Sequence, residues 1–164
     1  MTVSVWQEMA GNPTTVTHDV AVVGAGMVGS HLAGLLTGAG RDVALIEARY
    51  PAAGASGRIA GMVLVGSRYT YSEAIERFGH DKALEIWKLT DENVRLMGEI
   101  ADGSGVEHEE NGASYIARDS AFATRLRESA VMLEQDGFDA EYVDGDPMDR
   151  GFQATLLQPG DFAT

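Results

Sequence analysis

Near its start the chain contains Asp19-Val-Ala-Val-Val23, followed at once by Gly24-Ala-Gly-Met-Val-Gly29. The first run is short, apolar and rich in valine, which is typical of a strand covered on both faces. Leucines at helical spacing follow between Ser30 and Gly38, and a second apolar run occupies residues 43–46. The sequence therefore predicts a strand, a helix and a second strand in one right-handed βαβ unit.

The glycines of this G-x-G-x-x-G motif each have a physical task. Gly24 permits the tight turn from strand to helix, Gly26 lets the backbone approach a pyrophosphate, and Gly29 lets helix and strand pack closely. The helix N-terminus offers unpaired N–H groups and a partial positive charge to phosphate. Glu47 ends the second strand and can accept both hydroxyls of an adenosine ribose. The same carboxylate would repel a 2′-phosphate, which disfavours NADP.

A second glycine-rich segment follows, Gly54-Ala-Ser-Gly-Arg-Ile-Ala-Gly-Met62. Its backbone N–H groups and the Ser56 hydroxyl can form a concave anion-binding loop. Arg58 adds a fixed positive charge that can bind two phosphate oxygens at once. The segment predicts a second contact with a dinucleotide.

Together these features resemble the N-terminus of the D-amino-acid-oxidase-like FAD-dependent oxidoreductases, a family that includes glycine and sarcosine oxidases. The resemblance covers residues 19–63 and implies FAD rather than NAD. Ile59 departs from the family, which usually has asparagine there, so a polar contact near the flavin is expected to be absent. Arg58 stands where some relatives carry a histidine that attaches FAD, which implies a non-covalent flavin. The resemblance implies cofactor contacts from Gly24, Gly26, Met27, Val28, Gly29, Glu47, Ala48, Arg49, Ser56, Arg58, Ala60, Gly61 and Met62.

We expect a leader over residues 1–17, the N-terminal part of an FAD-binding Rossmann domain over residues 18–70, and part of an α+β substrate domain over residues 71–164. The fold class is α/β, with a Rossmann-like βαβ unit that is incomplete without a C-terminal half. The last part predicts helices over residues 72–101, broken at Gly79, and over residues 119–135, capped by Asp119 or Ser120. It also predicts a hairpin of residues 106–110 and 113–117 turning at Asn111-Gly112, strands over residues 138–143 and 152–157, and a turn at residues 158–161 that leads to no further element.

Charge and composition exclude several classes of function. The chain has 12 Lys and Arg against 25 Asp and Glu, a net charge of −13, which repels nucleic acid and anionic lipid. It has no cysteine, hence no thiolate metal site or cysteine nucleophile. Its histidines lack metal-ligand spacing, and no catalytic acid or base can be named. Neither a signal peptide nor an apolar run of ~20 residues is present, so we expect a cytoplasmic protein without a membrane partner.

A sheet of two parallel strands would leave an exposed edge and an uncovered face, which soluble proteins avoid. We therefore expect a second polypeptide to supply the C-terminal half of both domains, either as a separate subunit or as the other piece of a cut chain. The resemblance implies that the completed enzyme oxidises a small amine or amino acid by hydride transfer to the flavin, and that this chain alone is inactive. Two alternatives remain open: an NAD-linked dehydrogenase subunit, and a non-catalytic Rossmann subunit that stabilises a catalytic partner.

Overall fold

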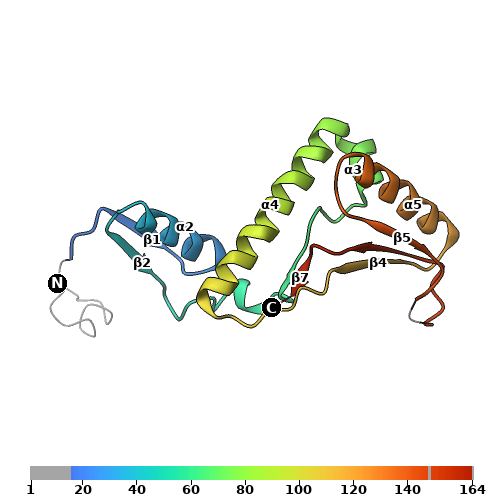
Figure 1. The fold of residues 1–164 in the computed structure, drawn as a ribbon. Helices are drawn as coiled ribbons and strands as arrows, with labels where there is room; N and C mark the ends of the chain where they lie inside the picture. Colours follow the sequence, from blue (N-terminus) through green and yellow to red (C-terminus); the bar gives the residue numbers. More distant parts are fainter. Residues whose placement is uncertain (1–15, 148, 164) are drawn as a thin grey trace, which may run out of the picture. The chain divides into compact units, whose positions relative to one another are not determined.

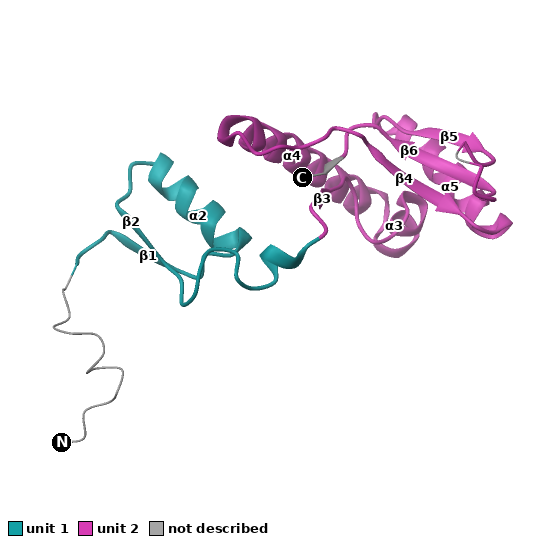
Figure 2. Cartoon of the chain, turned by 90° about the horizontal axis from the view of Figure 1, so that it is seen from below, with its two compact units in different colours: residues 1–59 teal, residues 60–164 magenta. Residues whose placement is uncertain are grey.

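The computed structural model describes residues 16–147 and 149–163, and the chain separates into two compact units. Residues 1–59 form the first unit and residues 60–164 the second (Figure 2). Residues 1–15 of the expected leader lie outside the described part of the chain. The expected domain limits, after residues 17 and 70, stay predictions.

The first unit is a parallel βαβ unit (Figure 1). β1 (Val20–Val23) pairs in parallel with β2 (Val43–Ile46), and α2 (Met27–Gly38) lies between them in the chain. Both strands confirm the prediction. The helix begins earlier than expected, because Gly26 is extended and its carbonyl accepts a hydrogen bond of 2.9 Å from Ser30 N. The glycine motif therefore supplies the first turn of the helix itself.

Apolar side chains of this small sheet are left exposed. Successive side chains of a strand point to opposite faces, and Val22 is 8% exposed whereas Val23 is 82% exposed. Ile46 is the parallel neighbour of Val23 and is 51% exposed. One face of the sheet thus presents apolar side chains that nothing in the described part of the chain covers.

The second unit is built on a three-stranded antiparallel sheet in the order β4-β6-β5. The strands are β4 (Ala113–Ala117), β6 (Ala154–Gln158) and β5 (Glu141–Asp144). α5 (Ser120–Gln135) contacts all three strands. The α/β fold class is thereby confirmed, with one parallel sheet in the first unit and antiparallel sheets in the second.

Two helices complete the core of the second unit. α3 (Tyr71–Phe78) and α4 (His80–Ser104) are separated at Gly79, which confirms the predicted break. The core contains residues from both helices, from α5 and from the sheet, among them Tyr71, Trp87, Leu126, Leu133 and Leu156.

The predicted hairpin of residues 106–110 and 113–117 is wrong. Residues 113–117 form β4, but residues 106–110 contain no strand beyond a single bridge at Glu109. β4 pairs instead with β6, which lies much later in the chain. The acidic segment 106–110 lacks apolar side chains at alternate positions, whereas β6 supplies the buried Leu156.

Two other expected strands lie slightly later than predicted, at β5 instead of residues 138–143 and at β6 instead of residues 152–157. The turn at residues 158–161 does lead to a further element, contrary to expectation. That element is β7 (Phe162–Ala163), which pairs antiparallel with β3 (Met62–Val63). Strands of two residues are too short to show a hydrophobic period, so the sequence pattern could not reveal them.

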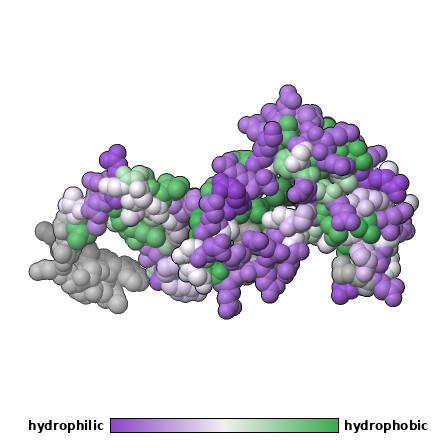
Figure 3. All heavy atoms as spheres, in the orientation of Figure 1, coloured by the Kyte–Doolittle hydropathy of each residue, from purple (hydrophilic) through white to green (hydrophobic). Residues whose placement is uncertain are grey.

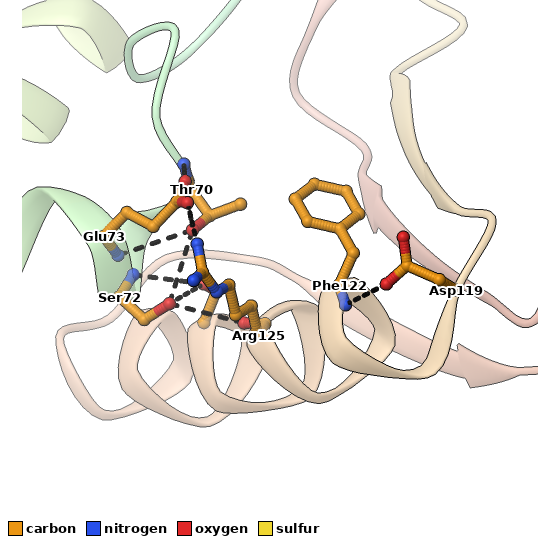
Figure 4. Close-up of polar contacts among 7 residues, drawn as sticks. Thr70, Ser72, Glu73, Asp119, Phe122 and Arg125 are labelled. Atoms are coloured by element: carbon orange, nitrogen blue, oxygen red, sulfur yellow. Dashed lines mark hydrogen bonds and ion pairs between the residues drawn. The ribbon is translucent and has the colours of Figure 1, made fainter.

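Polar side chains fix the ends of α3 and α5 (Figure 4). Thr70 and Glu73 form a reciprocal capping box at the start of α3. Glu73 also forms an ion pair with Arg125 of α5. Asp119 accepts a hydrogen bond of 2.8 Å from Phe122 N, so it is the cap of α5, one of the two residues predicted for that role.

A buried hydroxyl ties α3 to the end of α5, and its removal is expected to destabilise the second unit. Tyr71 Oη donates to Asp136 Oδ2 at 2.6 Å, and His80 Nε2 lies 2.9 Å from the same oxygen. We expect Tyr71→Phe to lower the free energy of unfolding by about 1.5–3 kcal/mol, because a hydrogen bond to a charged acceptor is lost. Urea denaturation measures this. Tyr142→Phe is the matched control, because the Tyr142 hydroxyl has no hydrogen bond in the described structure, and an equal loss in both variants would contradict the assignment.

Candidate cofactor site

The turn from β1 into α2 brings the helix N-terminus against the end of the strand. Gly24 has φ of +101°, and its N–H donates to Ile46 O at 2.7 Å. A Cβ atom on Gly29 would lie 1.9 Å from Gly24 O, so no larger residue fits without moving the backbone. The first N–H groups of a helix lack intrahelical partners, and the residues just before α2 are Gly24, Ala25 and Gly26, whose small size lets a ligand approach the backbone closely.

The second glycine-rich segment lies directly against this turn. Ser56 is the first residue of η1 (Ser56–Arg58), and its Oγ accepts a hydrogen bond of 2.9 Å from Met27 N. A Cβ atom on Gly26 would lie 3.1 Å from the same Oγ. Ala52 N also donates to Ala25 O at 2.8 Å. The two segments that the sequence singled out therefore meet at the N-terminus of α2.

Glu47 links the same turn to the end of β2. Its Oε2 accepts a hydrogen bond of 3.0 Å from Ala25 N, and its Oε1 accepts one of 3.1 Å from Arg49 N. These two N–H groups lower the pKa of the Glu47 carboxyl below its ordinary value, so it is ionised at neutral pH. The two carboxylate oxygens together offer about four acceptor sites, so capacity for a ligand hydroxyl remains.

Ala25 is a central residue that the sequence analysis did not select. It is 2% exposed, its N–H binds Glu47, and its carbonyl binds Ala52 N. It thus joins three segments through its backbone alone. Because the contacts use no side-chain chemistry, the variable positions of the glycine motif gave no signal for it.

The other predicted residues divide between the two units. Met27, Val28, Ala48, Arg49 and Arg58 belong to the first unit and are exposed. Within the described residues Arg58 forms no ion pair, which leaves its guanidinium available to an anion. Ala60, Gly61 and Met62 are the first three residues of the second unit.

The Ser56 hydroxyl can be tested separately from the glycines. We expect Ser56→Ala to weaken FAD binding by about tenfold, because Met27 N–H loses its acceptor and the ligand loses a donor. Fluorescence titration of FAD measures the dissociation constant. Thr37→Ala, which removes an exposed hydroxyl near the other end of α2, should leave it unchanged. Equal affinities of the Ser56→Ala variant and the unmodified protein would remove Ser56 from the site.

The described residues contain neither a group of three or more possible metal-ligating side chains nor a helix long and apolar enough to cross a membrane. The geometry instead suits an elongated anion with a sugar attached. It offers backbone N–H groups at the start of α2, a hydroxyl at Ser56, a cation at Arg58 and a carboxylate at Glu47. A diphosphate esterified to adenosine matches these groups. Its phosphate oxygens accept hydrogen bonds from the N–H groups, Ser56 and Arg58, and its ribose hydroxyls donate to Glu47.

Comparison with known proteins gives matches over most of the chain. The family model described as FAD dependent oxidoreductase matches residues 19–163. A probable oxidoreductase, OrdL of Haemophilus influenzae, is 34% identical over 87 residues, which are 52% of this chain and 20% of that protein.

Solved structures show the same fold over nearly the whole chain. Glycine oxidase from Geobacillus kaustophilus matches with a TM-score of 0.71 and 22% identity, over 90% of this chain and 41% of its own. Glycine oxidase from Bacillus cereus matches with a TM-score of 0.63 and 24% identity, over 90% of this chain and 40% of its own. L-amino acid deaminase from Proteus myxofaciens has a TM-score of 0.70 and 15% identity, over 90% and 33%. The chain thus spans a fifth of the curated relative and about two fifths or less of these structures.

Proposed function

The chain belongs to the family of FAD-dependent oxidoreductases, and we propose that it forms the FAD-binding portion of an enzyme that oxidises an amine or an amino acid. The observation that carries the proposal is the contact of Ser56 with Met27 N at the start of α2. It brings a second donor loop to the phosphate-binding turn. Similarity to glycine oxidases and L-amino acid deaminases supports the choice of a substrate with a carbon–nitrogen bond.

The diphosphate would lie at the N-terminus of α2. Gly24 and Gly26 keep side chains out of its way, Gly29 lets α2 pack closely on β1, and the N–H groups of Met27 and the following residues supply partial positive charge. The Ser56 hydroxyl accepts the Met27 N–H and can therefore donate its own proton to a phosphate oxygen. Arg58 would neutralise part of the diphosphate charge.

The adenosine would lie beside the end of β2. Glu47 is held in place by two backbone N–H groups and keeps free lone pairs for the ribose hydroxyls. Ala48 and Arg49 would flank the adenine. Ala60, Gly61 and Met62 would continue toward the flavin, and Arg58 at the place of the attaching histidine favours a flavin held without a covalent bond.

When bound, FAD supplies the acceptor for a hydride from the carbon next to the substrate nitrogen. The residues of this chain bind and orient it; none of the residues assigned here transfers a proton. We propose that the chain is inactive by itself, because the proposed contacts reach the cofactor and leave the substrate side to other polypeptide.

A second polypeptide, or another part of a longer chain, is proposed to cover the apolar surfaces of the first unit. Val23 and Ile46 expose one face of the sheet. On α2, Val28, Leu32 and Leu35 are 81%, 44% and 60% exposed, and apolar side chains gather over this helix in Figure 3. Burying these apolar side chains on the sheet and on α2 would stabilise the first unit. The occupant we propose is the C-terminal half of the same family fold, since the chain spans only about 40% of the glycine oxidases it matches.

Purifying the protein together with the molecules that remain bound to it tests the proposal. We expect a yellow preparation whose visible spectrum is that of an oxidised flavin, FAD in the supernatant after denaturation, and an additional polypeptide on a denaturing gel. Addition of candidate amines and amino acids under anaerobic conditions should bleach the flavin absorption for the true substrate class. A colourless preparation that binds NAD in place of FAD would overturn the proposal.

A further inference from the structure

Asp161 connects three segments of the second unit. Its Oδ1 accepts a hydrogen bond of 2.6 Å from Val65 N, and its backbone carbonyl accepts one of 2.9 Å from Gly112 N, just before β4. The next residues form β7, which pairs with β3 so that Val63 lies opposite Phe162. Asp161 thus binds the segment after β3 through its side chain and the residue before β4 through its backbone.

The chain leaving β3 is fixed on its other side as well. Val65 is 6% exposed and belongs to the core of the second unit. Gly66 N donates to Thr90 Oγ1 of α4 at 2.8 Å. Asp161 and Thr90 therefore accept two successive N–H groups, those of Val65 and Gly66, in the segment that follows β3.

The Asp161 carboxyl is fully buried, with 0% of its surface exposed. Its second oxygen, Oδ2, has no hydrogen-bond partner within the described residues. Burial raises the pKa of this carboxyl, the Val65 N–H acts in the opposite direction, and Asp91 raises it further. Burial, and then the charge of Asp161, raise the pKa of the Tyr115 phenol. Asparagine is neutral and has the same shape, and its amide oxygen can accept the Val65 N–H. We therefore expect Asp161→Asn to keep this hydrogen bond.

We propose that Asp161 is a positioning residue for the cofactor: by holding Val65 and the strand before it, it keeps Ala60, Gly61 and Met62 in the conformation that contacts FAD. This inference rests on the proposed function, in which those three residues run beside the flavin. Asp161 itself touches no ligand in this account. Its effect is on the fraction of molecules whose β3 segment is ready to bind.

The test compares three variants in the complete FAD-loaded assembly. Asp161→Ala should weaken FAD binding about tenfold, as expected if the competent conformation falls to roughly a tenth of the population, and should shift the visible flavin spectrum. Asp161→Asn should restore both the affinity and the spectrum. Ser129→Ala removes a buried hydroxyl that binds Ser72 N at 3.1 Å and has no link to β3. It should lower the melting temperature and leave FAD affinity unchanged.

Each outcome decides the matter. Unchanged FAD affinity in Asp161→Ala would overturn the inference, and so would an equal loss in Ser129→Ala, which would show an effect of general stability. If Asp161→Ala does not fold, Thr90→Val takes its place, because it removes the acceptor of Gly66 N–H. It should weaken FAD binding severalfold, and no change would overturn the inference. An unmodified assembly that binds no FAD would instead reject the proposed function itself.

Discussion

Replacing Glu47 by arginine is expected to weaken FAD binding by about a hundredfold or more. The Glu47 carboxylate accepts the N–H groups of Ala25 and Arg49 and is proposed to accept the ribose hydroxyls. Glu47→Arg removes all of these acceptors and puts a second cation beside Arg49. Charge-assisted hydrogen bonds are among the stronger polar contacts with a ligand, so losing those to both ribose hydroxyls accounts for a change of about this size. Fluorescence titration with FAD measures the change.

Two control variants separate the role of Glu47 from a general effect of charge. Glu128→Arg makes the same change at an exposed position of α5 and should leave FAD affinity unchanged. Glu47→Gln keeps one side-chain acceptor and should lie between the unmodified protein and Glu47→Arg. If Glu47→Arg and Glu128→Arg bound FAD equally well, Glu47 would not be in the site.

The same carboxylate predicts how FAD binding depends on pH. The N–H groups of Ala25 and then Arg49 hold the pKa of Glu47 below the ordinary value of 4.5. A carboxyl with a lowered pKa in the folded state contributes its full effect above its ordinary pKa. That contribution is lost only as the pH falls through the lowered value. FAD affinity should therefore change little from neutrality down to the ordinary pKa of 4.5 and decrease only below it, and Glu47→Gln should abolish this acidic decrease.

Replacing Gly29 by alanine is expected to abolish FAD binding and to destabilise the first unit. The new Cβ would lie 1.9 Å from Gly24 O and 3.1 Å from Gly24 C. Neither neighbour is a flexible side chain, so α2 and β1 would have to separate at the point where the diphosphate is proposed to bind. Overpacking of this kind costs typically about 1–3 kcal/mol and sometimes more. FAD titration and thermal unfolding of the assembly measure the two effects.

Gly34 gives a matched control on the same helix. A Cβ atom there would meet no atom within 4 Å, and alanine in a helix interior is favoured over glycine by roughly 0.5–1 kcal/mol. Gly34→Ala should therefore bind FAD normally and be as stable as the unmodified protein or more so. Similar behaviour of the two alanine variants would mean that close packing at Gly29 is not needed.

The phosphate-binding half could be predicted from sequence because its signals are local. Apolar runs give β1 and β2, and the positions of Gly24, Gly26 and Gly29 give the turn between β1 and α2. The expected helix starts at Ser30, later than α2 itself, because Met27 and Val28 lie within the glycine motif. The contact of Ser56 with Met27 N joins residues 29 positions apart; the resemblance placed both beside the diphosphate, but only the structure shows that they bind each other.

The second unit could be predicted in its helices but less well in its strands. Gly79 and Asp119 mark helix ends through local chemistry. The pairing of β4 with β6 depends on which distant strand offers a complementary apolar face, and Asn111-Gly112 gave a misleading local signal for a hairpin. Asp161 carried no signal at all, because its importance comes from burial and from its bond to Val65 N, 96 positions away.

A crystal structure of the assembly with FAD bound would test the proposed diphosphate-binding site most directly. Oxygens of the diphosphate should lie within hydrogen-bond distance of Ser56 Oγ and of N–H groups in the first turn of α2, with a ribose hydroxyl on Glu47. A diphosphate bound elsewhere, with Ser56 and Arg58 turned away from Gly24–Gly29, would contradict the account.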